Sequence, residues 1–104
     1  MAVFHHVGVP TKTRQPNEIF IAGGKVHITD ASAHPYRFEH LRFEPDSPMP
    51  EILKNRPHIA YMVDDLSAAL AGEEVILQPF DATPELRVAF IVKDGMPVEV
   101  MQAI

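Results

Sequence analysis

The sequence of 104 residues contains no cysteine. This absence excludes disulfide bonds, thiolate metal sites and cysteine nucleophiles. Basic residues are scarce as well: nine Lys and Arg stand against fourteen Asp and Glu, and the net charge is -5. Binding to nucleic acid requires clustered Lys and Arg that neutralise phosphates. We therefore expect no nucleic-acid partner.

Long apolar runs are also absent. No stretch approaches the ~20 apolar residues that span a bilayer, and Met1–His6 lacks the charged start and apolar run of a signal peptide. We expect a soluble, cytoplasmic protein with no membrane partner. The sequence has neither a phosphate-binding G-x-x-x-x-G-K loop nor the G-x-S-x-G motif of serine hydrolases.

The chain is instead rich in proline and in short apolar segments. Ten prolines argue against long helices, because proline lacks an amide hydrogen and clashes with the preceding turn. Apolar, β-branched segments bounded by turn residues predict short strands at 3–9, 18–21, 26–29, 38–43, 58–63, 75–77, 87–92 and 98–101. The length suits one domain over residues 1–104, of the α+β class with a mostly antiparallel sheet.

The connections between these strands differ in the two halves. A short helix is predicted over Leu66–Ala71, capped by Asp64 or Asp65 and ended by Gly72. Asp94–Gly95 predicts a tight hairpin. In the first half, residues 11–17 are polar and contain a proline, so a loop is expected there, and three prolines predict an extended linker over residues 45–50.

A weak internal repeat relates the two halves. His6–Val9 resembles His58–Tyr61, each a histidine that opens an apolar strand with a small residue two places on. Phe38–Leu41 resembles Val98–Met101, each an apolar strand that contains a glutamate. The histidines are 52 residues apart and the glutamates 60, so the second half has room for a helix that the first half lacks.

The repeat aligns four residues that suit a metal ion: His6, Glu39, His58 and Glu99. A carboxylate buried without a partner would cost several kcal/mol, so each glutamate needs a counter-charge or a metal. Imidazole suits Zn, Fe and Ni, and carboxylate extends the set to Mn and Mg. The sequence leaves open whether His5 or His6 points inward.

Each candidate also has a simpler interpretation. His58 suits the edge of a strand, and Glu99 suits a position that faces solvent. Glu39 could pair with Arg37 or Arg42. The recurrence of both strand types in the same order favours the shared metal site over these separate explanations.

Three stretches resemble the vicinal-oxygen-chelate superfamily of glyoxalases, bleomycin-resistance proteins and extradiol dioxygenases: Phe4–Pro10, Arg56–Leu66 and Lys93–Gln102. The resemblance implies two βαβββ-type modules, residues 1–50 and 51–104, which form a cupped, mixed sheet around a divalent metal. The first module lacks most of its helix. That lack implies either an open side of the cup or an apolar sheet face covered by a dimer partner. We expect a homodimer, with the site formed within one chain or across a swapped dimer.

The same resemblance implies a metal-dependent enzyme with His6, Glu39, His58 and Glu99 as ligands of one Ni, Zn, Mn or Fe ion. The ion would act as a Lewis acid on a small substrate with two neighbouring oxygens and stabilise an enolate-like charge. Glu39 or Glu99 would serve as the catalytic base, and the analogy with glyoxalase I favours Glu99. Isomerase, epimerase or lyase chemistry follows.

Two other functions remain open. An Fe(II) extradiol-type dioxygenase uses two histidines and one carboxylate, which requires Glu39 to lie outside the coordination shell. A non-catalytic, drug-sequestering dimer would bind its ligand without metal in a cleft lined by aromatic groups, for which the chain offers Phe20, Phe38, Phe43, Tyr61 and Phe90.

Overall fold

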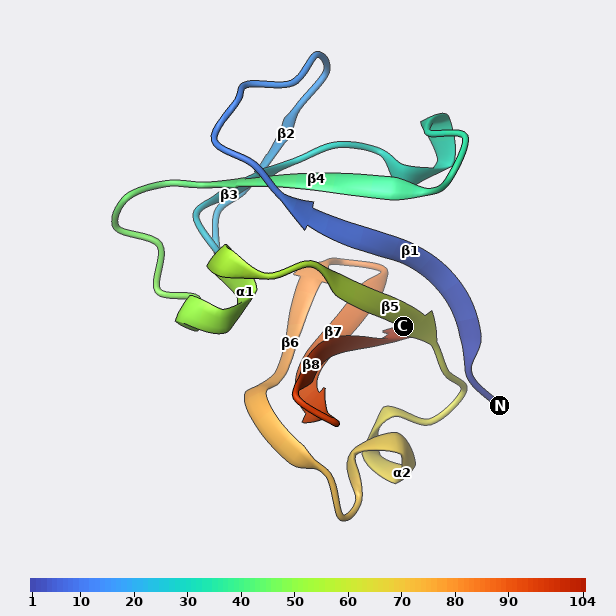
Figure 1. Cartoon of the computed structure of the whole chain (residues 1–104). Coiled ribbons are helices and arrows are strands. Elements are labelled where there is room, and N and C mark those ends of the chain that lie inside the picture. Colours follow the sequence, from blue (N-terminus) through green and yellow to red (C-terminus); the bar gives the residue numbers. More distant parts are fainter.

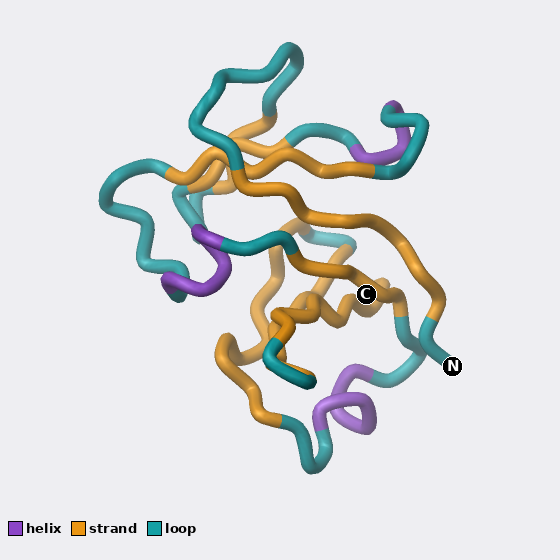
Figure 2. The backbone as a smooth tube through the Cα atoms, viewed as in Figure 1, coloured by secondary structure: helices purple, strands orange, loops and turns teal.

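The computed structural model describes residues 1–104 as an α+β fold built on one curled sheet of eight strands (Figures 1 and 2). In chain order its elements are β1 (Val3–Pro10), β2 (Ile19–Ile21), β3 (Val26–Ile28), the short 3-10 helix η1 (Ala31–Ala33), β4 (Phe38–Phe43), α1 (Glu51–Asn55), β5 (His58–Met62), α2 (Leu66–Leu70), β6 (Glu74–Thr83), β7 (Leu86–Lys93) and β8 (Met96–Ala103). No helix has the length and apolar character needed to cross a membrane.

The sheet is organised around the pairing of β1 with β5. The strand order is β2-β3-β4-β1-β5-β8-β7-β6. β1 and β5 are antiparallel, β4 runs parallel to β1, and β8 runs parallel to β5. From the centre outward, the strands of the first half are β1, β4, β3 and β2, and those of the second half are β5, β8, β7 and β6. Both halves therefore have the same strand order, with the first strand at the centre and the second strand at the edge.

The second half is packed on both faces of its strands. Inside the curl, Ala60, Val88 and Met101 form one buried cluster. On the outer face, Leu66 of α2 covers Ala89, Ile91 and Val100. Alternate residues of β7 therefore serve opposite faces, which requires the nearly continuous apolar sequence of that strand.

The local signals of the second half form as the sequence predicts. The side chain of Asp65 accepts a hydrogen bond from the amide of Ala68 at 3.2 Å and caps α2. Gly72 follows the helix with φ +76°. Asp94 and Gly95 both have positive φ, of 53° and 78°, as a two-residue hairpin turn demands.

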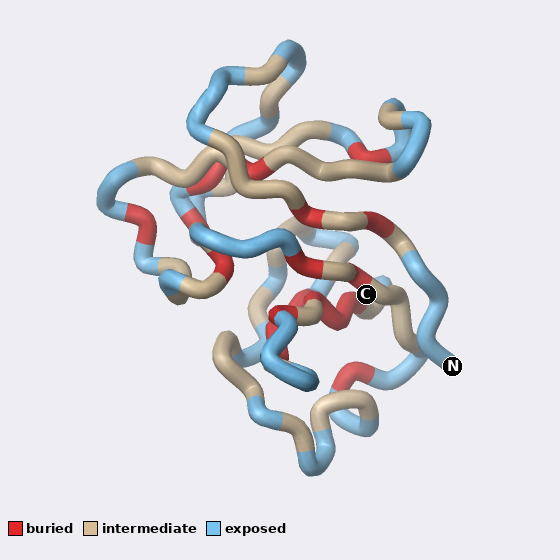
Figure 3. The backbone as a smooth tube through the Cα atoms, in the orientation of Figure 1, coloured by how far each residue is buried: buried red, intermediate tan, exposed pale blue.

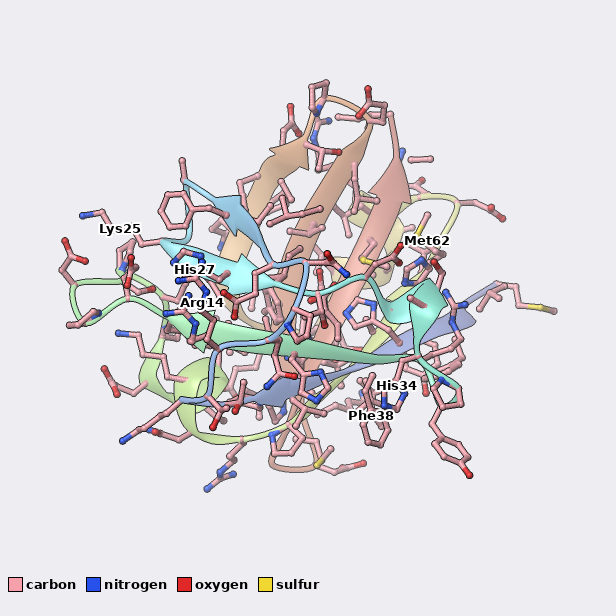
Figure 4. All side chains as sticks on the ribbon, turned by 90° about the horizontal axis from the view of Figure 1, so that it is seen from above. Arg14, Lys25, His27, His34, Phe38 and Met62 are labelled. Atoms are coloured by element: carbon pink, nitrogen blue, oxygen red, sulfur yellow. The ribbon has the colours of Figure 1, made fainter.

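The first half has no helix over residues 11–18, and its outer face carries charged side chains beside the aromatic rings of Phe20 and Phe38. Arg42 donates two hydrogen bonds to Glu18, at 3.0 and 2.7 Å. His27 Nε2 lies 3.3 Å from Glu44 Oε1 on the same face, and Figure 4 shows His27 there beside β4. These contacts occupy part of the surface that a helix would cover.

Two elements differ from the prediction. α1 follows the proline-rich linker, where no helix was expected, because five residues are too few to show helical periodicity. β6 extends to Thr83 and includes Pro79. The strand lies at the edge of the sheet and its pairing with β7 shifts register at several points, and both conditions tolerate proline.

Candidate metal centre

The four predicted ligand residues lie on four adjacent strands at the centre of the sheet: Glu39 on β4, His6 on β1, His58 on β5 and Glu99 on β8. Buried residues are most frequent on β7 and β8, and His6 on β1 and His58 and Ala60 on β5 are buried as well (Figure 3). Residues that are far apart in sequence therefore meet because the sheet order places the first strand of each half next to the fourth strand of the same half.

Each histidine faces a small residue on the neighbouring strand. In the β1–β5 register, His6 pairs with Ala60 and Gly8 pairs with His58. Ala60 has no exposed surface, and a Cβ on Gly8 would lie 2.1 Å from Cε1 of His58. The recurring pattern of a histidine with a small residue two places on thus gives each ring the space to lie over the opposite strand. The two rings approach to 5.8 Å between centroids.

Three of the four residues form a tight, buried group. Nε2 of His58 lies 3.0 Å from Oε1 of Glu99, and Nε2 of His6 lies 3.3 Å from the same oxygen. Their potential ligand atoms all fall within 4.8 Å of one another. The residues are 1%, 2% and 8% exposed for His58, His6 and Glu99 respectively. A carboxylate this deeply buried is stabilised here by the two imidazoles.

Glu39 belongs to the same region but not to this group. Its Oε1 lies 3.6 Å from Nε2 of His6, and its side chain is 17% exposed. The predicted set of four therefore divides into three residues in mutual contact and one that touches only His6.

The pKa values of the two glutamates are shifted in opposite directions from the ordinary value of a glutamate. Burial alone would raise the pKa of Glu99, but the contacts with His58 and His6 outweigh it and lower the pKa to about 2. Burial raises the pKa of Glu39 to about 7; the charge of His6 opposes this rise and that of Glu99 adds to it. The two imidazoles thus favour the anionic form of Glu99, and burial disfavours the anionic form of Glu39.

The group of three fits a divalent ion in its donor types, in the spacing of its donor atoms and in having a buried nitrogen without a hydrogen-bond partner. Tetrahedral ligands at ~2.0–2.1 Å from a zinc ion lie about 3.3 Å from one another. The 3.0 and 3.3 Å separations at Glu99 match that spacing. Nε2 of His6 is buried without a properly angled hydrogen bond. Buried polar atoms rarely lack a partner, so this nitrogen is free to bind a metal.

A β-bulge adds a fifth residue that the sequence could not assign. The β1–β5 register shifts between Phe4 and His6, so His5 is the extra residue of the bulge. His5 and His6 consequently both line the inside of the sheet. Nδ1 of His5 lies 2.8 Å from Nδ1 of His6. Burial, together with the charges of His6 and Arg37, lowers the pKa of His5, which keeps the ring neutral and able to accept a hydrogen bond.

A pocket of about 130 Å³ opens beside the cluster, inside the curl of the sheet. His6, Glu39 and Glu99 line one side of it, and eleven of its seventeen lining residues are hydrophobic. Of the aromatic residues considered for a drug-binding cleft, Phe90 lines this pocket, whereas Phe38 stacks on His34 at the outer surface with ring centroids 4.6 Å apart (Figure 4).

Comparisons with known proteins support the fold alone. No family model matches the chain, and no curated protein matches it. Among solved structures, the crystal structure of a hypothetical protein from Bacillus halodurans C-125 superposes with a TM-score of 0.68 at 16% sequence identity. The match covers 97% of this chain and 94% of that chain. At this level of identity the likeness concerns the fold and carries no activity.

Proposed function

We propose that the chain is a divalent-metal-dependent enzyme of the vicinal-oxygen-chelate type, an isomerase, epimerase or lyase that acts on a small substrate with two neighbouring oxygens. The identical strand order on either side of the β1–β5 pair supports an arrangement of two related modules, 1–50 and 51–104. This arrangement would place the ligands within a single chain. A homodimer remains part of the proposal.

The observation that carries the proposal is the group of His6, His58 and Glu99. Two imidazoles and one carboxylate converge in the interior, two nitrogens (Nε2 of His6 and Nδ1 of His58) are left without a partner, and a pocket opens next to them. A group built only for stability would satisfy these nitrogens or replace the three polar residues with apolar ones. Such convergence in a pocket is typical of a catalytic or binding centre.

When bound, the ion would supply Lewis-acid polarisation of the substrate oxygens. His6, His58 and Glu99 would hold it. Glu39 lines the pocket next to this group and touches only His6, so its carboxylate is free to take a proton from a substrate carbon beside a carbonyl. The contacts of Glu99 favour Glu39 as the base, in contrast to the expectation from glyoxalase I.

One specific observation favours a second candidate. Two histidines and one carboxylate are the ligand set of non-haem Fe(II) oxygenases, and Glu39 lies outside the group of three. An extradiol-type dioxygenase is therefore the alternative enzyme.

The first experiment is the metal content of the purified protein and of Glu99→Ala by elemental mass spectrometry, each after reloading with Ni, Zn, Mn or Fe(II). We expect near-stoichiometric metal in the wild type and little in the variant. The loaded protein is then offered small α-hydroxy and α-oxo carbonyl compounds without oxygen, and catechols with Fe(II) and oxygen. Anaerobic turnover supports the isomerase, and oxygen consumption supports the dioxygenase. Absence of metal in the wild type would overturn both enzymes and favour a non-catalytic binding protein.

A further inference from the structure

The pocket beside the cluster has no positive side chain in its wall. Apart from His5, His6, Glu39 and Glu99, its lining is apolar except for Thr83, and none of the nine Lys and Arg residues contributes to it. The fixed charges in the pocket lining are therefore those of Glu39 and Glu99; Arg37, which donates to the carbonyl of His5, lies outside the lining.

Several basic residues are held in ion pairs outside the pocket lining. Arg42 is paired with Glu18 and Arg87 with Asp81. Lys25 pairs with Asp46 at the periphery of the molecule, where Figure 4 shows its side chain. None of these three can serve a ligand in the pocket without breaking an existing ion pair.

The volume of the pocket sets a second limit. An apolar cavity of about 150 Å³ is large enough for benzene. At about 130 Å³, this pocket is slightly smaller and limits the enclosed part of a ligand to about one ring or a chain of similar size. Val26, Leu41, Val88 and Met101 form part of the wall that such a ligand would touch.

We infer that the ligand of this pocket is a small, uncharged, largely apolar molecule whose polar groups are confined to the end that faces His6 and Glu99. The inference rests on the proposed metal centre for that polar end, whereas the exclusion of negative charge rests on the wall alone. A carboxylate or phosphate on the far end of a ligand would be buried without a counter-charge, which is strongly unfavourable.

The test compares two probes that differ in one ring substituent, which is apolar in 4-methylcatechol and anionic in 3,4-dihydroxybenzoate. Both offer neighbouring oxygens to the ion, and the methyl group of one replaces the carboxylate of the other. Binding is measured by calorimetry on the zinc-loaded protein under argon. We expect 4-methylcatechol to bind at least ~10-fold more tightly, because the carboxylate loses its hydration in an apolar wall. Equal or tighter binding of 3,4-dihydroxybenzoate would overturn the inference, as would no binding of either probe.

A charge introduced into the wall should reverse the preference. Met49 lines the pocket and is half-buried. Met49→Lys is expected to raise the affinity for 3,4-dihydroxybenzoate about 10-fold or more while weakening that for 4-methylcatechol. Ser67→Lys adds the same charge on the exposed side of α2 and is expected to change neither affinity. An unchanged preference in Met49→Lys would contradict the placement of the ligand.

The same probes separate this inference from the proposed function. If the protein takes up no zinc, the metal centre is wrong. Selectivity is then read on the metal-free pocket from the methyl NMR signals of Met49 and Met101, with the same pair of probes. Shifts caused by 4-methylcatechol alone would uphold the uncharged ligand, and shifts caused by both probes, or by neither, would overturn it.

Discussion

A Cβ atom on Gly8 would lie 2.1 Å from Cε1 of His58, so the imidazole ring occupies the space that any other residue at position 8 would fill. The two residues are directly paired across β1 and β5. The glycine therefore determines where the His58 ring lies, and with it the distance to Glu99.

Gly8→Ala should displace the ring and weaken the metal centre. The added methyl group overlaps a side chain in a closely packed interior, for which we expect a loss of about 1–3 kcal/mol in the free energy of unfolding. Zinc titration should show weaker binding, and urea unfolding should show the lower stability. Gly23→Ala is the matched control, because no atom lies within 4 Å of the added Cβ. Unchanged zinc affinity in Gly8→Ala would contradict the role of His58 as a ligand.

The two glutamates should differ as ligands. Glu99→Gln removes the anion that contacts both histidines and should reduce zinc affinity by more than the roughly 10–100-fold typical of outer-shell changes. Glu39→Gln leaves the group of three intact and should have a smaller effect on affinity and a larger one on turnover. Zinc titration and anaerobic turnover measure the two effects. Equal losses of zinc affinity would indicate four ligands instead of three.

His5 should orient His6 toward the ion. A proton on Nδ1 of His6 donated to Nδ1 of His5 leaves Nε2 of His6 with the free lone pair that a ligand needs. His5→Phe should lower zinc affinity by about 10–100-fold, and His5→Asn should restore much of it through its amide oxygen. Nitrogen-15 NMR of the histidine rings reports the tautomer directly. An unchanged His6 tautomer in His5→Phe would show that His5 only fills space.

Acid should weaken the first half through Glu18. The hydrogen bonds from Arg42 lower the pKa of Glu18 from 4.5 to about 2. A carboxyl group with a lowered folded-state pKa contributes stability above its unfolded pKa, and the contribution is lost as the pH falls from about 4.5 to 2. Arg42→Met should therefore flatten the pH dependence of urea unfolding in this range. Arg87→Met breaks a pair whose members are about half exposed, and its effect should be smaller.

Features that depend on neighbouring residues in the chain were predicted well from the sequence, and features that depend on distant residues were not. Apolar alternation located β4 without error and the other strands to within a few residues, except for β6. Capping and turn residues located α2 and the β7–β8 hairpin. The recurring histidine and glutamate identified the three residues that converge, because the repeat in sequence corresponds to equal positions in the strand order.

The remaining features depend on tertiary pairing. The bulge that turns His5 inward exists only in the register of β1 with β5, so no property of the residue itself reveals it. Glu39 touches His6 but lies outside the group of three, whereas Glu99 belongs to it, although β4 and β8 share the same sequence pattern. The ion pair on the outer face of β3 and β4 follows from Glu18 reaching Arg42 across 24 residues of chain.

The position of β8 has a consequence for how the protein folds. The central group joins residues 6, 58 and 99, and pairings over such long separations form slowly. A chain whose last strand has not yet docked holds two histidines without their carboxylate, so we expect uptake of the proposed ion to follow that step. During refolding, metal binding should therefore occur later than the collapse of the chain. Its rate would report when β8 pairs with β5.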